Sequence, residues 1–361
     1  MHGPRLTRGS TSAALPVVNL KEEIMSNHTK KRVSIVGALA ATALLALAAC
    51  STSGGTGTNS TSGAASGAGA KIIKVGFSQV GSESGWRAAN TKDIQATLTT
   101  ANGFDLKFSD AQQKQENQIQ AIRSYIAQGV DVIAFSPVVE SGWDAVLQEA
   151  KAAKIPVVLT DRAVDSKDTS LYRTFLGSDF VKEGTLVGEW VVKDSGDKEI
   201  NIVELQGTTG SAPANDRMAG FKEAIKGHAN LKIIASQTGN FTRSEGKTVM
   251  EGFLSANPKI DLLFAHNDDM GLGAMEAIEA AGKVPGKDIK IVTIDAVKDG
   301  MQALADGKFN FIAECSPLLG QQLADVIKQV MAGKTPQQRI ITEETTFTQD
   351  QAKAALPTRK Y

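Results

Sequence analysis

Short apolar runs alternate with amphipathic stretches along most of the chain, which is the pattern of alternating strands and helices. The first run, residues 72–77 (IIKVGF), is rich in β-branched residues and predicts a buried strand. A polar loop with glycine follows, and residues 87–98 then have a composition that favours a helix. Because ligands of open α/β sheets bind beyond the carboxyl ends of the strands, we expect this loop to form part of a ligand site.

The alternation runs through two successive units of similar size. Predicted strands cover residues 72–77, 104–108, 130–135, 155–159 and 175–178 in the first unit, and 199–205, 231–236, 262–265, 289–294 and 309–313 in the second. Predicted helices cover residues 87–98, 112–129, 143–153, 218–226 and 270–282, and residues 207–217 are expected to form a loop. This alternation argues for parallel, doubly wound sheets. We therefore predict the α/β class, with two Rossmann-like lobes that face each other across a cleft.

Polar and aromatic side chains recur just beyond the predicted strands. Carboxylates accept hydrogen bonds from hydroxyl groups, and guanidinium groups donate hydrogen bonds to hydroxyl groups. Such charge-assisted hydrogen bonds are stronger than those between neutral groups. Aromatic faces cover the apolar C–H face of a sugar ring. Each residue also has a structural alternative, because a strand-end aspartate is often a helix cap and an arginine is often part of a surface ion pair. Their recurrence favours a site for a neutral polyol such as a sugar, made of Trp86, Arg87, Asp110, Asp161, Arg162, Arg217, Phe241, Asn267, Asp295 and Glu314.

The overall charge argues against a nucleic-acid partner. The chain of 361 residues has 39 Lys+Arg and 39 Asp+Glu, a formal net charge of +0, so it lacks the basic excess that a phosphate backbone attracts. Its length suggests two domains of roughly 150 residues each. The two cysteines, Cys50 and Cys315, cannot be assumed to pair.

The N-terminal region has the pattern of a secretory leader. A basic run at residues 30–32 precedes an apolar stretch, residues 33–49, which ends LAAC at Cys50. This ending resembles the bacterial lipobox, which implies lipidation of Cys50 as the mature N-terminus of a chain anchored to the membrane. The alternative is a transmembrane anchor, for which the stretch is near the lower limit of about 17 residues. Met25 is the better start of such a leader, and residues 51–70 form a Gly/Ser/Thr-rich tether.

The sequence lacks the common signatures of catalysis and cofactor binding. Of the four histidines, His228 and His266 lie beyond the leader, and their spacing does not suit zinc. The glycine-rich stretch GTTGSA lacks the Lys-Ser/Thr of a P-loop, and SESG is not a nucleophile elbow. Asp268 and Asp269 are interpreted as carboxylates at a helix start. We therefore expect no cofactor and no metal.

Several segments resemble the ribose-type family of periplasmic sugar-binding proteins, in its galactofuranose-binding branch. The segments are KVGFSQVGSESGWRAAN, QQKQENQIQAIRSYIAQGVD, ELQGTTGSAPANDRMAGFKEAI, SQTGNFTRSEGK and FAHNDDMGLGA, and the resemblance extends from Lys71 to roughly Phe347. It implies two lobes joined by a three-crossing hinge, with the sugar held in the hinge cleft. The implied boundaries are residues 1–50 for the extension and leader, 51–70 for the tether, 71–177 and 315–342 for lobe 1, and 178–314 and 343–361 for lobe 2.

The resemblance also assigns roles to the strand-end residues. Asp161-Arg162 matches the family's strand-end pair, and the residues of the second lobe that match are Arg217, Phe241, Asn267 and Asp295. Trp86 stands in the aromatic position of the first loop, and Glu83 and Asp110 are further matches. Glu314 stands where ribose binders have glutamine, and Gly85 replaces a second aromatic. These two departures argue against ribose and fit the galactofuranose branch.

The function implied is a lipid-anchored, extracytoplasmic substrate-binding protein of a sugar ABC importer, without a catalytic step. Its expected partners are a monosaccharide and the membrane permease, and the chain is expected to be monomeric. A sugar-responsive transcription regulator of the LacI type shares the lobe pair, but a leader and tether stand where its helix-turn-helix would be. A glycosidase is a third class, although arginines around a hinge cleft suit retention better than general acid catalysis. A sugar receptor that feeds a sensor kinase or a chemotaxis system remains an alternative.

Overall fold

The computed structural model describes residues 71–361, which belong to one compact unit. The predicted leader, the predicted lipidation site Cys50 and the tether of residues 51–70 lie outside the described residues. Within residues 71–361, every helix is too short or too polar to cross a membrane.

Two six-stranded sheets form the framework of the fold. The first has the order β11-β5-β4-β3-β1-β2 with all strands parallel, and the second has the order β12-β10-β9-β8-β6-β7, in which only β12 is antiparallel to its neighbour. The first sheet contains β1 (Ile73–Gln79), β2 (Phe104–Asp110), β3 (Val132–Phe135), β4 (Val157–Thr160), β5 (Thr174–Gly177) and β11 (Arg339–Ile341). The second contains β6 (Ile200–Gln206), β7 (Leu231–Thr238), β8 (Leu262–Ala265), β9 (Lys290–Asp295), β10 (Phe311–Glu314) and β12 (Thr346–Phe347).

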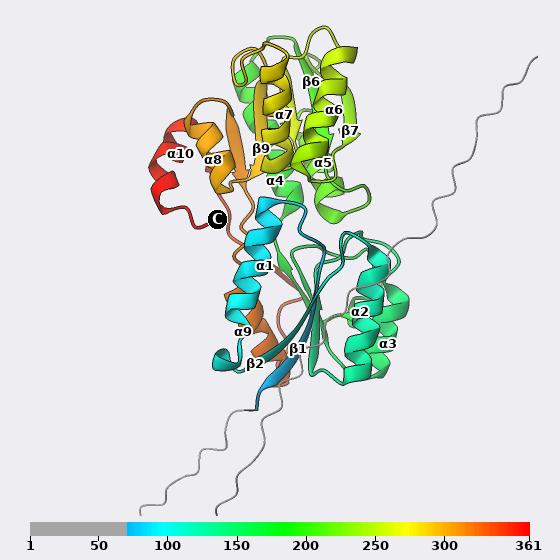
Figure 1. The fold of residues 1–361 in the computed structure, drawn as a ribbon. Coiled ribbons are helices and arrows are strands. Elements are labelled where there is room, and N and C mark those ends of the chain that lie inside the picture. Colours follow the sequence, from blue (N-terminus) through cyan, green and yellow to red (C-terminus); the bar gives the residue numbers. More distant parts are fainter. Residues whose placement is uncertain (1–70) are drawn as a thin grey trace, which may run out of the picture. The chain divides into compact units, whose positions relative to one another are not determined.

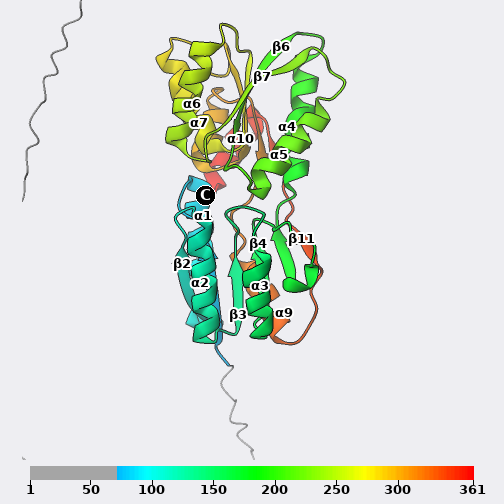
Figure 2. The same cartoon turned by 90° about the vertical axis from the view of Figure 1, so that its right-hand side faces the viewer.

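Helices cover both faces of each sheet, which is why the central strands are continuous apolar runs. On the first sheet, α1 packs with α9 on one side and α2 with α3 on the other (Figure 1). On the second sheet, α6 packs with α7 on one side and α4 with α5 on the other (Figure 2). The helices are α1 (Gly85–Thr97), α2 (Gln115–Gln128), α3 (Asp144–Ala152), α4 (Phe180–Ser195), α5 (Ala212–Ala224), α6 (Arg243–Ala256), α7 (Asp268–Ala280), α8 (Lys298–Ala305), α9 (Gly320–Met331) and α10 (Gln349–Ala355), with short 3₁₀ turns at η1 (Thr100–Asn102), η2 (Thr169–Leu171) and η3 (Leu356–Thr358).

The predicted fold class, two doubly wound α/β lobes, is confirmed. The chain passes between the sheets in three segments, residues 178–179, 315–319 and 342–345, which we call the crossing segments. Each sheet therefore contains strands from two separate parts of the chain.

One predicted boundary is wrong. Residues 212–217 were expected to belong to a loop, but α5 begins at Ala212. Pro213 lies in the first turn of the helix, where no backbone hydrogen bond requires its missing N–H. Arg217 consequently projects from a helix, which fixes its direction more firmly than a loop would.

Candidate functional site

A cavity lies where the carboxyl ends of strands from both sheets meet. It holds about 290 Å³ of empty space, its open mouth included. Its walls are formed by Glu83, Ser84, Trp86, Arg87, Asp161, Arg162, Phe180, Pro213, Arg217, Phe241, Asn267, Asp295 and Cys315. All the side chains predicted for the site, except Asp110 and Glu314, are therefore brought together here.

The first-lobe wall consists of buried charged side chains that contact one another. Asp161, just beyond β4, accepts a hydrogen bond from Ser136 Oγ (2.8 Å) and pairs with Arg87 Nη1 (2.7 Å). Arg87 Nε also donates to Glu83 Oε1 (3.0 Å), and Arg162 Nη2 lies 3.6 Å from the same oxygen. These four charged side chains are at most 5% exposed. Burial, together with the Arg87 charge, lowers the pKa of Arg162 to about 10.

Two buried atoms of this wall make no hydrogen bond within the described part of the chain, and they are Glu83 Oε2 and Arg162 Nε. Arg162 Nε has the Asp161 carboxylate 3.8 Å away, which is too far for a hydrogen bond. Buried polar atoms are otherwise almost always paired, because leaving one unpaired costs about 1–3 kcal/mol. One is an acceptor and the other a donor, and both belong to residues that line the cavity. A hydroxyl group can satisfy either of them, because it both donates and accepts.

The second-lobe wall is centred on Arg217. Its Nε donates to Glu183 Oε2 (2.7 Å), its Nη1 donates to the His266 carbonyl, and its Nη2 lies 3.7 Å from Asp295 Oδ1. The Phe241 ring is close to two cations, with its centroid 5.2 Å from Arg162 Cζ and 5.9 Å from Arg217 Cζ. An aromatic ring and fixed guanidinium groups thus meet in the cavity wall.

Three wall residues have backbone conformations that side chains rarely adopt. Asp161, Phe241 and Asp295 have φ values of 64°, 63° and 129°. Such conformations cost on the order of 1–3 kcal/mol each and cluster at functional sites. Asn267 stabilises the backbone conformation at Phe241, because its Nδ2 donates to the Phe241 carbonyl (3.1 Å). Its Oδ1 accepts from Met270 N (3.0 Å) and so caps α7.

Asp268 does more than the sequence indicates. It lies in the first turn of α7 as expected, but it is fully buried and accepts hydrogen bonds from Thr293 Oγ1 and Val297 N. Burial is the main cause that raises its pKa, to about 7. Burial also raises the pKa of Asp295 well above its usual range, against the opposing effect of Arg217 and with the Asp268 charge adding to it. Asp268 thus fixes the segment that bears Asp295.

Direct hydrogen bonds join the two lobes around the cavity. Gly85 N, at the start of α1, donates to Asp269 Oδ2 of α7 (2.7 Å). Nearby, Trp86 Nε1 donates to the Cys315 carbonyl of a crossing segment (2.7 Å). On the other side, Asn215 Nδ2 donates to Glu140 Oε2 (2.6 Å). The lobes are therefore in a closed arrangement. Sequence reasoning interpreted Asp269 only as a helix-start carboxylate and did not name Glu140, because their partners in the other lobe lie far away along the chain.

Two predicted residues lie elsewhere. Asp110 is exposed at the end of the edge strand β2, and its Oδ1 accepts from Gln112 N (2.7 Å) in a local turn. Glu314 Oε1 accepts from Arg359 Nη1 (2.7 Å) and from the Tyr361 hydroxyl (2.9 Å), so it binds the C-terminal segment. Side chains alternate along a strand, and the neighbouring Cys315 lines the cavity instead. The wall residues that sequence reasoning did not name are Ser84, Phe180, Pro213 and Cys315.

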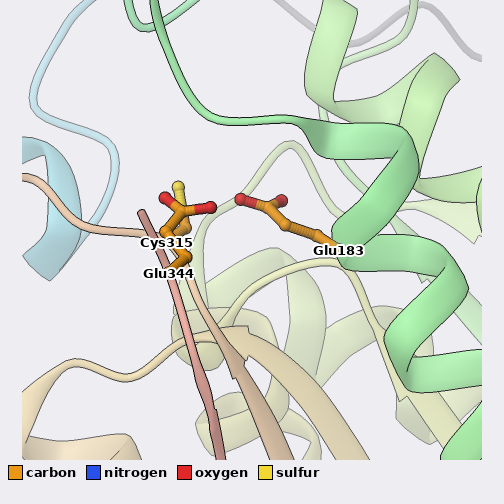
Figure 3. Close-up of side chains that lie close together, drawn as sticks. All are labelled: Glu183, Cys315 and Glu344. Carbon is orange, nitrogen blue, oxygen red and sulfur yellow. The ribbon is translucent and has the colours of Figure 1, made fainter. Parts of the chain in front are cut away.

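One group of buried side chains has metal-ligand types. Oxygens of Glu183 and Glu344 and the Cys315 sulfur lie within 4.8 Å of one another (Figure 3). Arg217 already donates to Glu183, and Ser178, Ser316 and Thr342 supply donors to Glu344. These donors pair one oxygen of each carboxylate, Glu183 Oε2 and Glu344 Oε1, and the arrangement by itself does not indicate a cation site.

Comparisons with known proteins agree with this geometry. The sequence profile of the family described as "Periplasmic binding protein domain" matches residues 75–335. The galactofuranose-binding protein YtfQ of Escherichia coli is 49% identical over 292 residues, which cover 80% of this chain and 92% of that protein.

Two solved structures are similar over the same part of the chain. A Mycobacterium smegmatis structure in complex with β-D-fucofuranose has 62% identity and a TM-score of 0.78, and the match covers 80% of this chain and 95% of that one. The periplasmic binding protein of an arabinose ABC transporter from Shewanella sp. ANA-3, bound to α- and β-L-arabinofuranose, has 50% identity and a TM-score of 0.77, covering 80% and 96%.

Proposed function

Because the chain belongs to the periplasmic binding protein family, we propose that its cavity holds a monosaccharide in the furanose form. The chain is a sugar-binding protein of ABC import systems and not an enzyme. The relatives named above bind galactofuranose, fucofuranose and arabinofuranose, and these sugars share a five-membered ring. Galactofuranose is the ligand we propose for this chain.

The pair of unpartnered atoms at the first-lobe wall carries this proposal. Glu83 Oε2 would accept from one sugar hydroxyl, and Arg162 Nε would donate to another. Asp161, Arg87, Arg217 and Asp295 would bind further hydroxyls by charge-assisted hydrogen bonds. The rings of Trp86 and Phe241 would cover the C–H faces of the sugar, and Asn267 would complete the second-lobe wall. We keep Asp110 and Glu314 outside this set, since they do not reach the cavity.

Calorimetric titration with galactofuranose, galactopyranose, arabinose and ribose tests the proposal. We expect galactofuranose to bind most tightly, with ribose at least about tenfold weaker, because buried donors that lose their hydroxyl partner cost about 1–3 kcal/mol. Tighter binding of the pyranose would contradict the furanose assignment. Absence of binding by all four sugars would contradict the proposed function.

Membership of the family indicates in general terms where the chain is located and what it interacts with. The family places the chain outside the cytoplasm. We further propose that it acts as a monomer, that closure of the lobes presents a surface to an ABC permease, and that Cys50 bears a lipid anchor. The lobe boundaries given under Sequence analysis belong to the same proposal.

We predict that the native protein starts at a diacylglyceryl-modified Cys50. The leader pattern that ends LAAC supports this expectation. Mass spectrometry of the membrane-extracted protein should yield an N-terminal fragment with lipidated Cys50, and Cys50→Ala should remove both the modification and the membrane attachment. A mature chain that retains residues 1–49 would count against the prediction.

A further inference from the structure

Glu183 lies behind the cavity and not in its wall. It belongs to the first turn of α4, is buried, and its Oε2 accepts from Arg217 Nε (2.7 Å). Among the described residues, Arg217 has one other close contact of opposite charge, Asp295 at 3.7 Å. Glu183 therefore supplies the main anchor that sets the guanidinium of Arg217 against the cavity.

The other oxygen of Glu183 faces the crossing segments. Figure 3 shows its carboxylate extending from α4 toward Glu344 and Cys315. Glu344 Oε1 accepts from Ser178 Oγ, Ser316 N (3.0 Å) and Thr342 Oγ1 (3.2 Å). Ser178, Ser316 and Thr342 belong to the three different crossing segments. A single carboxylate thus joins all the connections between the lobes, and Glu183 lies within 4.8 Å of it.

The charges around Glu183 do not balance if every acid is ionised. The groups that face it are Arg217 from α5, Asp295 at the end of β9, Cys315 beyond β10 and Glu344 beyond β11. Only Arg217 is a cation, and Asp295 shares it. Two buried carboxylates this close repel each other, so one of them retains a proton. Burial raises the pKa of Glu183 to about 8, with the Glu344 charge adding to the shift and Arg217 opposing it. Glu183 Oε1, which is buried and makes no hydrogen bond within residues 71–361, has room for that proton.

We propose that Glu183 is a positioning residue that couples the sugar cavity to the crossing segments. Its Oε2 holds Arg217 at the cavity, and its protonated Oε1 faces Glu344 without repelling it. This inference rests on the proposed sugar-binding function. It predicts that ionisation of Glu183 places two negative charges at the point where the lobes are joined, which disfavours the closed, sugar-holding arrangement.

Three variants test the proposal by calorimetry at pH 7, with the sugar that binds the wild type most tightly. Glu183→Ala should weaken binding about 10- to 100-fold, because the buried Arg217 loses its anchor. Glu183→Gln should bind within about threefold of the wild type, since the amide keeps an acceptor for Arg217 and an N–H toward Glu344. Glu189→Ala, which removes an exposed glutamate of the same helix, is the matched control and should not change the affinity.

The pH profile separates positioning from a merely structural role. The affinity of the wild type should fall as the pH rises through about 8, where Glu183 ionises, while Glu183→Gln should keep its affinity between pH 7 and 9. Wild-type affinity in Glu183→Ala, identical pH profiles of wild type and Glu183→Gln, or a Gln variant as weak as the Ala variant would each overturn the proposal. A wild type that binds no sugar at all would instead overturn the proposed function.

Discussion

Asp161→Ala is expected to weaken sugar binding by about 30- to 1,000-fold, which corresponds to about 2–4 kcal/mol. Asp161 is the partner of Arg87 Nη1 (2.7 Å) and the acceptor for Ser136 Oγ. Its removal leaves a buried guanidinium with less compensation and takes away a hydrogen-bond acceptor for the sugar. Calorimetric titration with galactofuranose measures the loss, and thermal unfolding shows whether the variant is folded.

Asp110→Ala is the matched control for this experiment. Asp110 is also an aspartate at a strand end, but it is exposed, and within residues 71–361 its side chain accepts a hydrogen bond only from Gln112 N of its own turn. We expect its loss to change the sugar affinity by less than about twofold, since surface substitutions away from a site have small effects. Equal affinities of Asp161→Ala and the wild type would refute the cavity as the binding site.

Asp268→Ala is expected to have the largest effect on stability, a loss of about 3 kcal/mol in the free energy of unfolding. The variant leaves Val297 N buried without its acceptor and also removes the bond from Thr293 Oγ1. This loss exceeds the ~1 kcal/mol that a helix-start carboxylate alone would contribute. Chemical denaturation in the absence of sugar measures it.

The control for Asp268 is Asp350→Ala. Asp350 lies in the first turn of α10 but is exposed, so its removal should cost only about 0.5 kcal/mol. Similar losses in the two variants would show that Asp268 acts only through its helix.

The protonated form of Asp268 is favoured in the folded state, because its pKa is raised from 3.8 to about 7. Its protonation therefore adds stability that is full below about pH 4 and disappears as the pH rises through 7.

The predicted strands agree with the structure wherever a strand is buried on both faces. Such strands as β3 and β8 are continuous apolar runs, and the residues just beyond them could be read as site candidates. Strands and helices that tertiary contacts create were not predicted. β11 is three residues long and mostly exposed, and β12 has two residues, so neither produces a recognisable pattern. No range was predicted for α4, α6, α8, α9 or α10.

The part of the candidate site that lies at strand ends could be predicted from the sequence. Asp161 lies just beyond the central strand β4 and Asp295 ends the central strand β9, and both reach the cavity. Asp110 ends an edge strand and does not. Glu314 and Cys315 differ by one position, and only the three-dimensional path beyond β10 decides which of them faces inward. Glu183 was not predicted either, because it contacts Arg217 from outside the cavity wall, and only the three-dimensional structure shows that contact.

The three crossing segments have a consequence for how the chain folds. β11 pairs with β5 (Arg339 with Phe175), so the first sheet is completed by a strand made long after the rest of that sheet. Until β11 arrives, β5 presents an open edge that can pair with another chain. Pairing across such sequence distances closes large loops and slows folding. The first lobe therefore gains its last strand only after the second-lobe strands β6 to β10 have been made, and β5 is the segment at which premature self-association is expected to start.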